Sequence, residues 1–299
     1  MKNSSKGYLW SFASIIAVSN VYIFSKAVLN EVHIAQFGLY WFGLGLIWNL
    51  IFVIKTCKWS TIANLHRGQY SILAIVGILE VTATTFFFTA IHTIENPSVT
   101  SFLGNMSPIF VTILGITILK ERFNYIEAIG ILLTLTGAFI ISYKGSASLS
   151  GMFINGTGYI VMSSLIFSFS TIIAKINIKK IPPALLSMNR AFFLLLFSFS
   201  MMLVFQKSFI IPSGAMVNIF IGSLLGPFLT VIAGYNALKY IEASRNSILG
   251  SSKSLFVVLG AYLYFQMLPK QHQLYGGILT VIGILLISFG KMILREKKN

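Results

Sequence analysis

The chain consists almost entirely of apolar blocks of about 20 residues, separated by short polar segments. A block of this length crosses the hydrocarbon layer of a bilayer as one helix. Of the 299 residues, 56% are hydrophobic and 10% are charged, whereas about 25% of the residues of a soluble domain are charged. The sequence therefore predicts an all-α integral membrane protein, and its connections are too short to form an extramembrane domain.

Hydropathy windows place ten membrane-spanning helices in the chain. The expected spans are residues 7–28, 34–54, 69–92, 97–118, 125–143, 152–175, 184–205, 215–238, 243–266 and 272–292. With the N-terminus inside, sixteen Lys and Arg residues fall on the inner side and four on the outer side. Because basic residues collect in cytoplasmic loops, this count predicts a multi-pass protein with both termini in the cytoplasm.

The second half of the chain repeats the first in a constant register. AIHTIENPSVTSFLGNMSPIFV, from Ala90, matches ALKYIEASRNSILGSSKSLFVV, from Ala237, with a one-residue gap. Beyond the gap the glycines stay aligned: Gly104 with Gly250, Gly130 with Gly276, and Gly137 with Gly283. The duplication predicts two five-helix repeats, residues 1–146 and 147–299. Because five is odd, the second repeat enters the membrane from the opposite side, as in secondary transporters whose site lies between inverted repeats.

The segment PIFVTILGITILKERFNYIEAIGILLTLTGAFII resembles the EamA group of drug/metabolite transporters. The matching positions are Pro108, Gly115, the Glu121–Arg122 pair, Gly130 and Gly137. The resemblance implies a ten-helix carrier of small metabolites in a bacterial inner membrane, often an exporter, with no bound cofactor. It also implies a central cavity surrounded by the first, third, fourth, sixth, eighth and ninth spans. The second repeat departs from the pattern, with Ser254 at the position of Pro108 and Met267 at that of Glu121.

Two ionisable residues are expected near the middle of spans, Glu80 in the third and Lys253 in the ninth. Each costs about 2.5–3.5 kcal/mol at a helix centre, so residues of this kind usually have a function. We expect both in the substrate pathway; the alternative is a structural ion pair that only fixes helix packing. Glu80 is the one acidic residue at the depth of Lys253, so Lys253 is expected to be neutralised by Glu80 or by an anionic substrate group.

Three further basic residues lie nearer the ends of spans. Arg190 is about two turns inside the seventh span, so its side chain is expected to extend to the lipid headgroups. Lys26 and Lys175 occupy matching places in the first and sixth spans. Both are expected to be membrane anchors, and a second interpretation is that they attract an anionic substrate to the two mouths of the pathway.

Neutral polar residues and helix breakers complete the candidate site. Those expected to contact a substrate are Asn20, Asn105, Asn236, Ser251 and Ser252, with Tyr235 in an apolar lining. Pro108 and Pro227 interrupt helical hydrogen bonding and are candidate hinges. The spacing of Gly222 and Gly226 indicates close helix packing.

Several classes of function are disfavoured by the sequence. It has no GxxxxGK[ST], HExxH or GxSxG motif, and its four histidines are too scattered to hold a metal, so no enzyme is expected. A single cysteine, Cys57, excludes an internal disulfide. The net charge of +15 is explained by loop residues of a membrane protein, and no nucleic-acid partner is expected.

The leading hypothesis is a secondary transporter, expected to be an exporter, of a small polar or amphipathic metabolite that works by alternating access. One alternative is a flippase-like protein that binds the anionic headgroup of a lipid or other amphiphile. Another is a structural or regulatory subunit that transports nothing. The expected partners are a small-molecule substrate and membrane lipids, and both a monomer and a homodimer fit the sequence.

Overall fold

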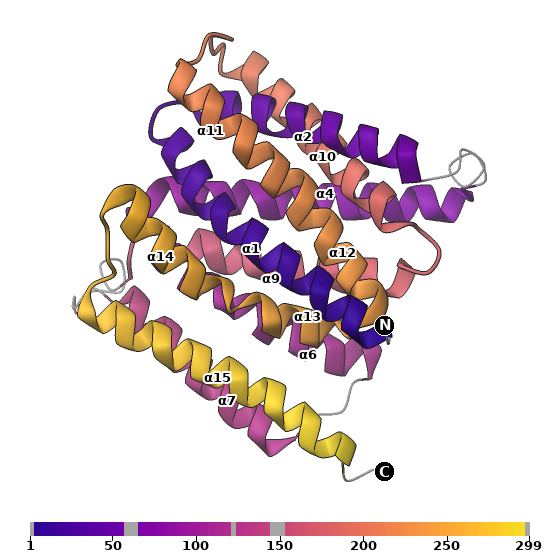
Figure 1. Ribbon diagram of the computed structural model, residues 1–299, viewed down its shortest axis with the longest axis vertical. Helices are drawn as coiled ribbons and strands as arrows, with labels where there is room; N and C mark the ends of the chain where they lie inside the picture. The colour runs from indigo at the N-terminus through magenta and orange to yellow at the C-terminus, as the bar shows by residue number, and fades with distance from the viewer. Residues whose placement is uncertain (1–2, 57–64, 121–123, 144–152, 297–299) are drawn as a thin grey trace.

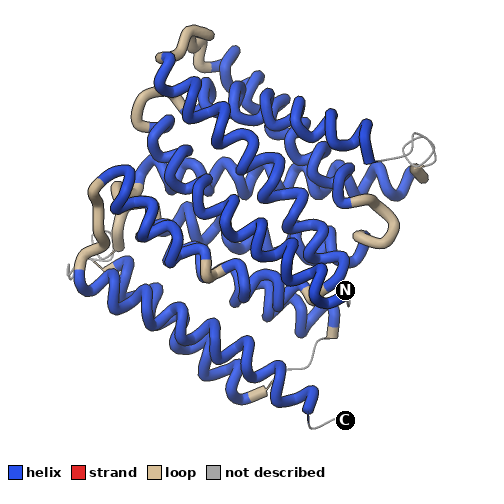
Figure 2. The backbone as a smooth tube through the Cα atoms, in the orientation of Figure 1, coloured by secondary structure: helices blue, strands red, loops and turns tan. Residues whose placement is uncertain are grey.

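The computed structural model describes residues 3–56, 65–120, 124–143 and 153–296, and these residues form helices joined by short loops (Figures 1 and 2). The Glu121–Arg122 pair and Cys57 lie outside the described residues. In the described ranges, eight helical segments are long and apolar enough to cross a membrane, and Lys253–Phe265 and Gln271–Leu286 are shorter apolar helices. The protein is therefore an all-helical, multi-pass membrane protein, as the sequence predicts.

The helices follow the predicted spans closely. In the first half they are α1 (Asn3–Leu29), α2 (Ile34–Thr56), α4 (Arg67–Thr93), α5 (Pro97–Leu103), the 3-10 turn η1 (Gly104–Met106), α6 (Ser107–Leu119) and α7 (Tyr125–Ser142). In the second half they are α9 (Thr157–Asn177), α10 (Pro183–Val204), α11 (Ser213–Ser223), the π-helical segment η2 (Leu224–Thr230), α12 (Val231–Tyr240), α13 (Ala243–Gly250), α14 (Lys253–Phe265) and α15 (Gln271–Glu296). Three spans are interrupted: the fourth by η1, the eighth by η2, and the ninth between α13 and α14.

The contacts between helices repeat from one half to the other. The second span packs on the seventh (α2 on α10), and the fifth packs on the tenth (α7 on α15). The contact of the third span with the sixth (α4 with α9) has its counterpart where the eighth span packs on α1. Exchanging the two halves therefore maps this set of contacts onto itself, which is what duplicated halves require.

Matching helices of the two halves run antiparallel. Gly130 and Gly137 of α7 lie against Gly283 and Gly276 of α15, where these two helices pack at one edge of the molecule (Figure 1). A Cβ on Gly137 would lie 2.5 Å from the carbonyl oxygen of Gly276, and a Cβ on Gly283 would lie 2.5 Å from that of Gly130. Gly137 follows Gly130 in α7, but its partner Gly276 precedes Gly283 in α15, so the two helices point in opposite directions. This is the relation expected of inverted repeats.

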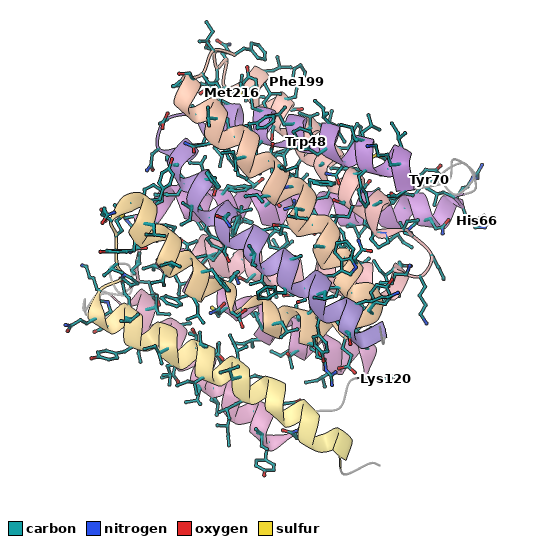
Figure 3. All side chains as sticks on the ribbon, in the orientation of Figure 1. Trp48, His66, Tyr70, Lys120, Phe199 and Met216 are labelled. Atoms are coloured by element: carbon teal, nitrogen blue, oxygen red, sulfur yellow. The ribbon has the colours of Figure 1, made fainter. Side chains whose placement is uncertain are left out.

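The outer faces of the helices are apolar, as a lipid-facing surface requires. Leu132 of α7 and Leu203 of α10 are examples, with 64% and 60% of their surface exposed. At the end of the bundle that holds the N-terminus, polar and basic residues are found. Figure 3 shows His66 and Lys120 at the end of the bundle where Figure 1 places the N-terminus, and Phe199 and Met216 toward the other.

Candidate functional site

A cavity of about 310 Å³ lies between the two halves and is lined by both. Its walls contain the spans that the family resemblance implies, and the second and seventh spans in addition, through Trp41, Phe42 and Arg190. Three of its lining residues have acidic or basic side chains, namely Glu80, Arg190 and Lys253. Most of the others are aromatic, aliphatic or small and polar. The arrangement is that of a binding site for a small molecule, mostly apolar with a few polar groups.

Two of the walls are formed where spans four and nine are interrupted. Gly104, in the η1 turn, and Gly250, the last residue of α13, both line the cavity. The two interruptions touch, because the Ser254 hydroxyl donates to the carbonyl oxygen of Ser101 at 3.1 Å. Pro108 lies at the start of α6, and Ser254 occupies the matching place in α14. Non-helical backbone at this depth is tolerated where it faces protein or a cavity.

Lys253 is held at this junction by an amide. Its Nζ donates to Asn105 Oδ1 at 3.4 Å, and the same oxygen accepts from the Ser254 hydroxyl at 3.3 Å. The backbone carbonyl of Lys253 accepts a hydrogen bond from Ser19 Oγ of α1 at 3.3 Å. Within the described ranges, no carboxylate lies at ion-pair distance from Lys253.

Glu80 pairs with Arg190 instead. Arg190 Nε donates to Glu80 Oε2 at 2.6 Å, and only 12% and 7% of the two side chains are exposed. Arg190 also donates to Thr84 Oγ1 at 2.8 Å. The second carboxylate oxygen of Glu80 accepts from the Ser170 hydroxyl at 2.6 Å and from the Tyr235 hydroxyl at 3.5 Å. The predicted Glu80–Lys253 pair is therefore wrong, although both residues line the cavity.

The prediction that Arg190 extends to the lipid headgroups is also wrong. Since α10 packs against α4, the guanidinium points into the protein and reaches a carboxylate there. The sequence carries no signal of this pair because its members are 110 residues apart. A general rule predicts only that an intramembrane charge lies next to an opposite charge, without identifying the partner.

On the other side of the cavity, an aromatic contact between spans two and eight occupies the place that corresponds to the Glu80–Arg190 pair. Trp41 of α2 packs on Gly222 and Gly226, and a Cβ on Gly222 would overlap its ring. The packing role predicted for these two glycines is confirmed. Pro227 lies within η2, and Asn49 Nδ2 donates to its carbonyl oxygen at 2.9 Å. Asn49 thus satisfies a carbonyl in the π-helical segment, which turns Gly226, Pro227 and Thr230 toward the cavity.

Lys26 and Lys175 make matching contacts, each with the backbone at the end of another helix of its own half. Lys26 Nζ donates to three carbonyl oxygens at the end of α4: Ile91 (3.0 Å), His92 (3.1 Å) and Ile94 (3.0 Å). Lys175 Nζ donates to two at the end of α12: Leu238 (2.6 Å) and Ile241 (2.7 Å). Each lysine therefore satisfies carbonyls that the end of a helix leaves without partners. The expectation that they anchor the chain to headgroups or attract substrate is corrected: they tie one span to another.

The remaining predicted residues lie in different surroundings. Tyr235 lines the cavity. Asn20, Asn236 and Ser252 donate to carbonyls of their own segments, Ile16, Ile232 and Leu249. These three and the buried Ser251 are not among the residues that line the cavity. Of the neutral candidates, Asn105 contacts Lys253 and Tyr235 contacts Glu80.

The cavity extends further toward the end of the bundle that holds the N-terminus. There Leu238, Asn246 and Ser247 line it. The residues that the repeat aligns with them at the other end are Ile91, Thr100 and Ser101, all fully buried at 0% exposure. None of these three residues lines the cavity, so the cavity reaches further toward the N-terminal end than toward the other.

Ten spans in two inverted halves around a mostly apolar cavity with a few charged groups define a multi-pass membrane protein of the inverted-repeat class. The chain belongs to the EamA-like transporter family, whose model matches residues 5–143 and again residues 154–289. One match falls in each half. This is a family of transporters and not of enzymes, in agreement with the lack of catalytic motifs.

Individual relatives are transporters by name. An uncharacterized transporter of Synechocystis sp. is 22% identical over 75% of this chain and 66% of its own length. One of Archaeoglobus fulgidus is 26% identical over 67% of each chain, and YxxF of Bacillus subtilis is 30% identical over 44% of this chain and 40% of its own. The chain thus aligns with about two thirds or less of the length of these relatives. A crystal structure with 13% identity and a TM-score of 0.74, covering 97% of this chain and 99% of that one, has the same fold.

Proposed function

We propose that the protein is a secondary transporter that exports a small polar or amphipathic metabolite by alternating access. The observation that carries the proposal is the cavity, which lies between inverted halves and contains charged and polar side chains. A structural subunit has no need of a cavity of about 310 Å³ lined by groups that are expensive to bury. Membership of a transporter family supports the same conclusion.

The interrupted spans supply a means of alternating access. In spans four and nine the two half-helices meet at the cavity, so one half-helix can tilt without breaking a continuous ladder of hydrogen bonds. In this structure the cavity reaches further toward the N-terminal end, where Leu238, Asn246 and Ser247 line it. Rocking of one repeat against the other would close the N-terminal end and open the opposite one, with the substrate held between them.

Counterflow in proteoliposomes tests this proposal. Purified protein is reconstituted, loaded with a pool of water-soluble metabolites, and exchange of each labelled metabolite is measured against empty liposomes. Saturable counterflow of any of them is the expected result. Reorientation of a labelled lipid headgroup without metabolite counterflow would instead support a flippase, and the absence of both would leave a structural or regulatory role.

A further inference from the structure

The charges that line the cavity do not balance. Two are positive, Arg190 and Lys253, and one is negative, Glu80. Glu80 and Arg190 form an ion pair at 2.6 Å and so neutralise each other. Lys253 faces only the neutral amide of Asn105, at 3.4 Å. The cavity therefore holds one positive charge without a counter-charge among the described residues.

The ammonium group of Lys253 has hydrogen-bonding capacity to spare. It carries three N–H donors, and in the described part of the chain it makes one hydrogen bond, which is long. A buried cation with so few partners is unstable unless an anion joins it. Gly250 lies three residues before it and lines the same cavity, and a Cβ on Gly250 would meet no atom within 4 Å. There is space next to Lys253 for a ligand group.

The Glu80 carboxylate is not available to bind a cationic substrate group. One of its carboxylate oxygens accepts from Arg190, and the other accepts from Ser170 and Tyr235. A substrate ammonium would have to displace these donors. An amino acid or an amine therefore finds a poor site in this cavity, whereas a carboxylate finds an available cation.

Between the two charged sites the wall is aromatic. The rings of Tyr22 and Phe87 lie edge to face with 5.1 Å between their centroids, and Phe87 lies 6.5 Å from Phe167. Arg190 lies over the Phe167 ring at 6.0 Å, which connects this wall to the ion pair. The hydroxyl of Tyr22 would be 3.1 Å from a Cβ on Gly104, next to Asn105 in the chain, which connects the wall to Lys253. An apolar ligand body, aromatic for preference, fits such a wall.

We propose that the transported metabolite is an organic monocarboxylate with an aromatic or other apolar body. Its carboxylate binds the Lys253 ammonium and its body packs on Tyr22, Phe87 and Phe167. This inference rests on the proposed transport function, since it names the substrate class of the same cavity. It distinguishes the protein from a carrier of amino acids or cations.

Three probes that share a phenyl ring and differ in charge test the proposal: phenylacetate, phenylalanine and phenethylamine. Dissociation constants are measured with purified protein by calorimetry, and counterflow of each probe is measured in proteoliposomes. We expect phenylacetate to bind at least tenfold more tightly than the other two. Equal or tighter binding of phenylalanine or phenethylamine, or binding of none of the three, would overturn the substrate class. Counterflow of another metabolite would still stand in that case, so failure of this inference is distinct from failure of the transport proposal.

Variants of Lys253 test whether this residue binds the carboxylate of phenylacetate. Lys253→Met should weaken phenylacetate binding roughly tenfold or more, the loss expected for a hydrogen bond to a charged group, whereas Lys253→Arg should retain most of it. Lys239→Met is the matched control, because Lys239 is exposed at the end of α12 outside the cavity. Thermal unfolding shows that each variant is folded. Full phenylacetate affinity in folded Lys253→Met protein would contradict the assignment of the carboxylate to Lys253.

Discussion

The fourth and ninth spans break at matching places, yet only one of them contains a proline. In the fourth span, Pro108 lies at the start of α6, just after the η1 turn. In the ninth, Ser254 occupies the same place, and α13 still ends at Gly250 and α14 still begins at Lys253. The break is therefore fixed by the contact between the two spans, where Ser254 bonds to Ser101 and Asn105, and not by the proline alone.

The chemistry at the two breaks differs more than their backbone does. Lys253 stands where the first half has Ser107, so one half supplies a cation and the other supplies the amide of Asn105 that contacts it. A similar difference separates the side walls, where the Glu80–Arg190 pair lies opposite the packing of Trp41 on Gly226. By contrast, the contacts that hold the scaffold together have stayed alike, as Lys26 and Lys175 demonstrate. The comparison teaches that the duplicated scaffold is symmetric while its cavity is not.

The largest effect on stability should come from breaking the Glu80–Arg190 pair. Removing one member of a buried ion pair leaves an uncompensated charge and costs about 3–5 kcal/mol. We expect Glu80→Gln and Arg190→Met each to lower the free energy of unfolding by this amount, measured in detergent. The double variant should recover most of the loss, because neither charge is then left alone.

Lys253 provides the contrast to this pair. Lys253→Met removes a charge that has no carboxylate partner, so it should leave the free energy of unfolding unchanged or raise it. Combined with Glu80→Gln, its effect should simply add, with a coupling energy below about 0.5 kcal/mol. A strong coupling between Glu80 and Lys253 would show that they form a pair after all.

Substitution of Lys26 or Lys175, which cap helix ends, should have intermediate and similar effects on the free energy of unfolding. Each donates to carbonyl oxygens at the end of another helix of its own half, and a hydrogen bond to a charged group contributes about 1.5–3 kcal/mol. Lys26→Met and Lys175→Met are therefore each expected to destabilise by about 2 kcal/mol in thermal unfolding. Lys207→Met, at an exposed loop residue, is the control. A loss in one lysine variant and none in the other would end the claim that the scaffold is symmetric.

Only a small effect on stability is expected at Pro108. If the contact between the spans fixes the break, Pro108→Ser should change the free energy of unfolding by less than about 1 kcal/mol, because the second half folds with serine in this place. Its effect should instead be on the transport rate, with equilibrium affinity unchanged, since the ease with which α6 tilts is altered. A large loss of affinity at a normal rate would reject the hinge role.

The spans themselves could be predicted because bilayer thickness imposes a length on every apolar block. The break of the fourth span also had a signal, in Pro108. The break of the ninth span had no signal in its own residues, because Ser251, Ser252 and Ser254 are compatible with a helix. This break depends on the contact with the neighbouring span. The repeat register nevertheless indicates the position of this break, because it aligns Ser254 with Pro108.

Partners at the site were harder to predict than positions. The depth of Glu80 and Lys253 in their spans led to the expectation of a pair, but depth says nothing about which face of a helix a residue occupies in the bundle. Arg190 reaches Glu80 across 110 residues of sequence because α10 packs on α4. The capping roles of Lys26 and Lys175 likewise depend on backbone carbonyl groups. Because every residue has one, the sequence does not show which of them lie near a lysine.

The most direct test of the account fills the cavity and measures transport. Gly250 lines the cavity, and a Cβ there would meet no atom within 4 Å, so the Cβ of Gly250→Phe lies in open space and its ring is added to the cavity wall. Gly158→Phe adds the same ring at an exposed residue of α9 where a Cβ also meets no atom within 4 Å. Counterflow in proteoliposomes should be abolished by Gly250→Phe and unchanged by Gly158→Phe, with both proteins folded in thermal unfolding. Normal counterflow in folded Gly250→Phe protein would contradict the claim that substrate passes through this cavity.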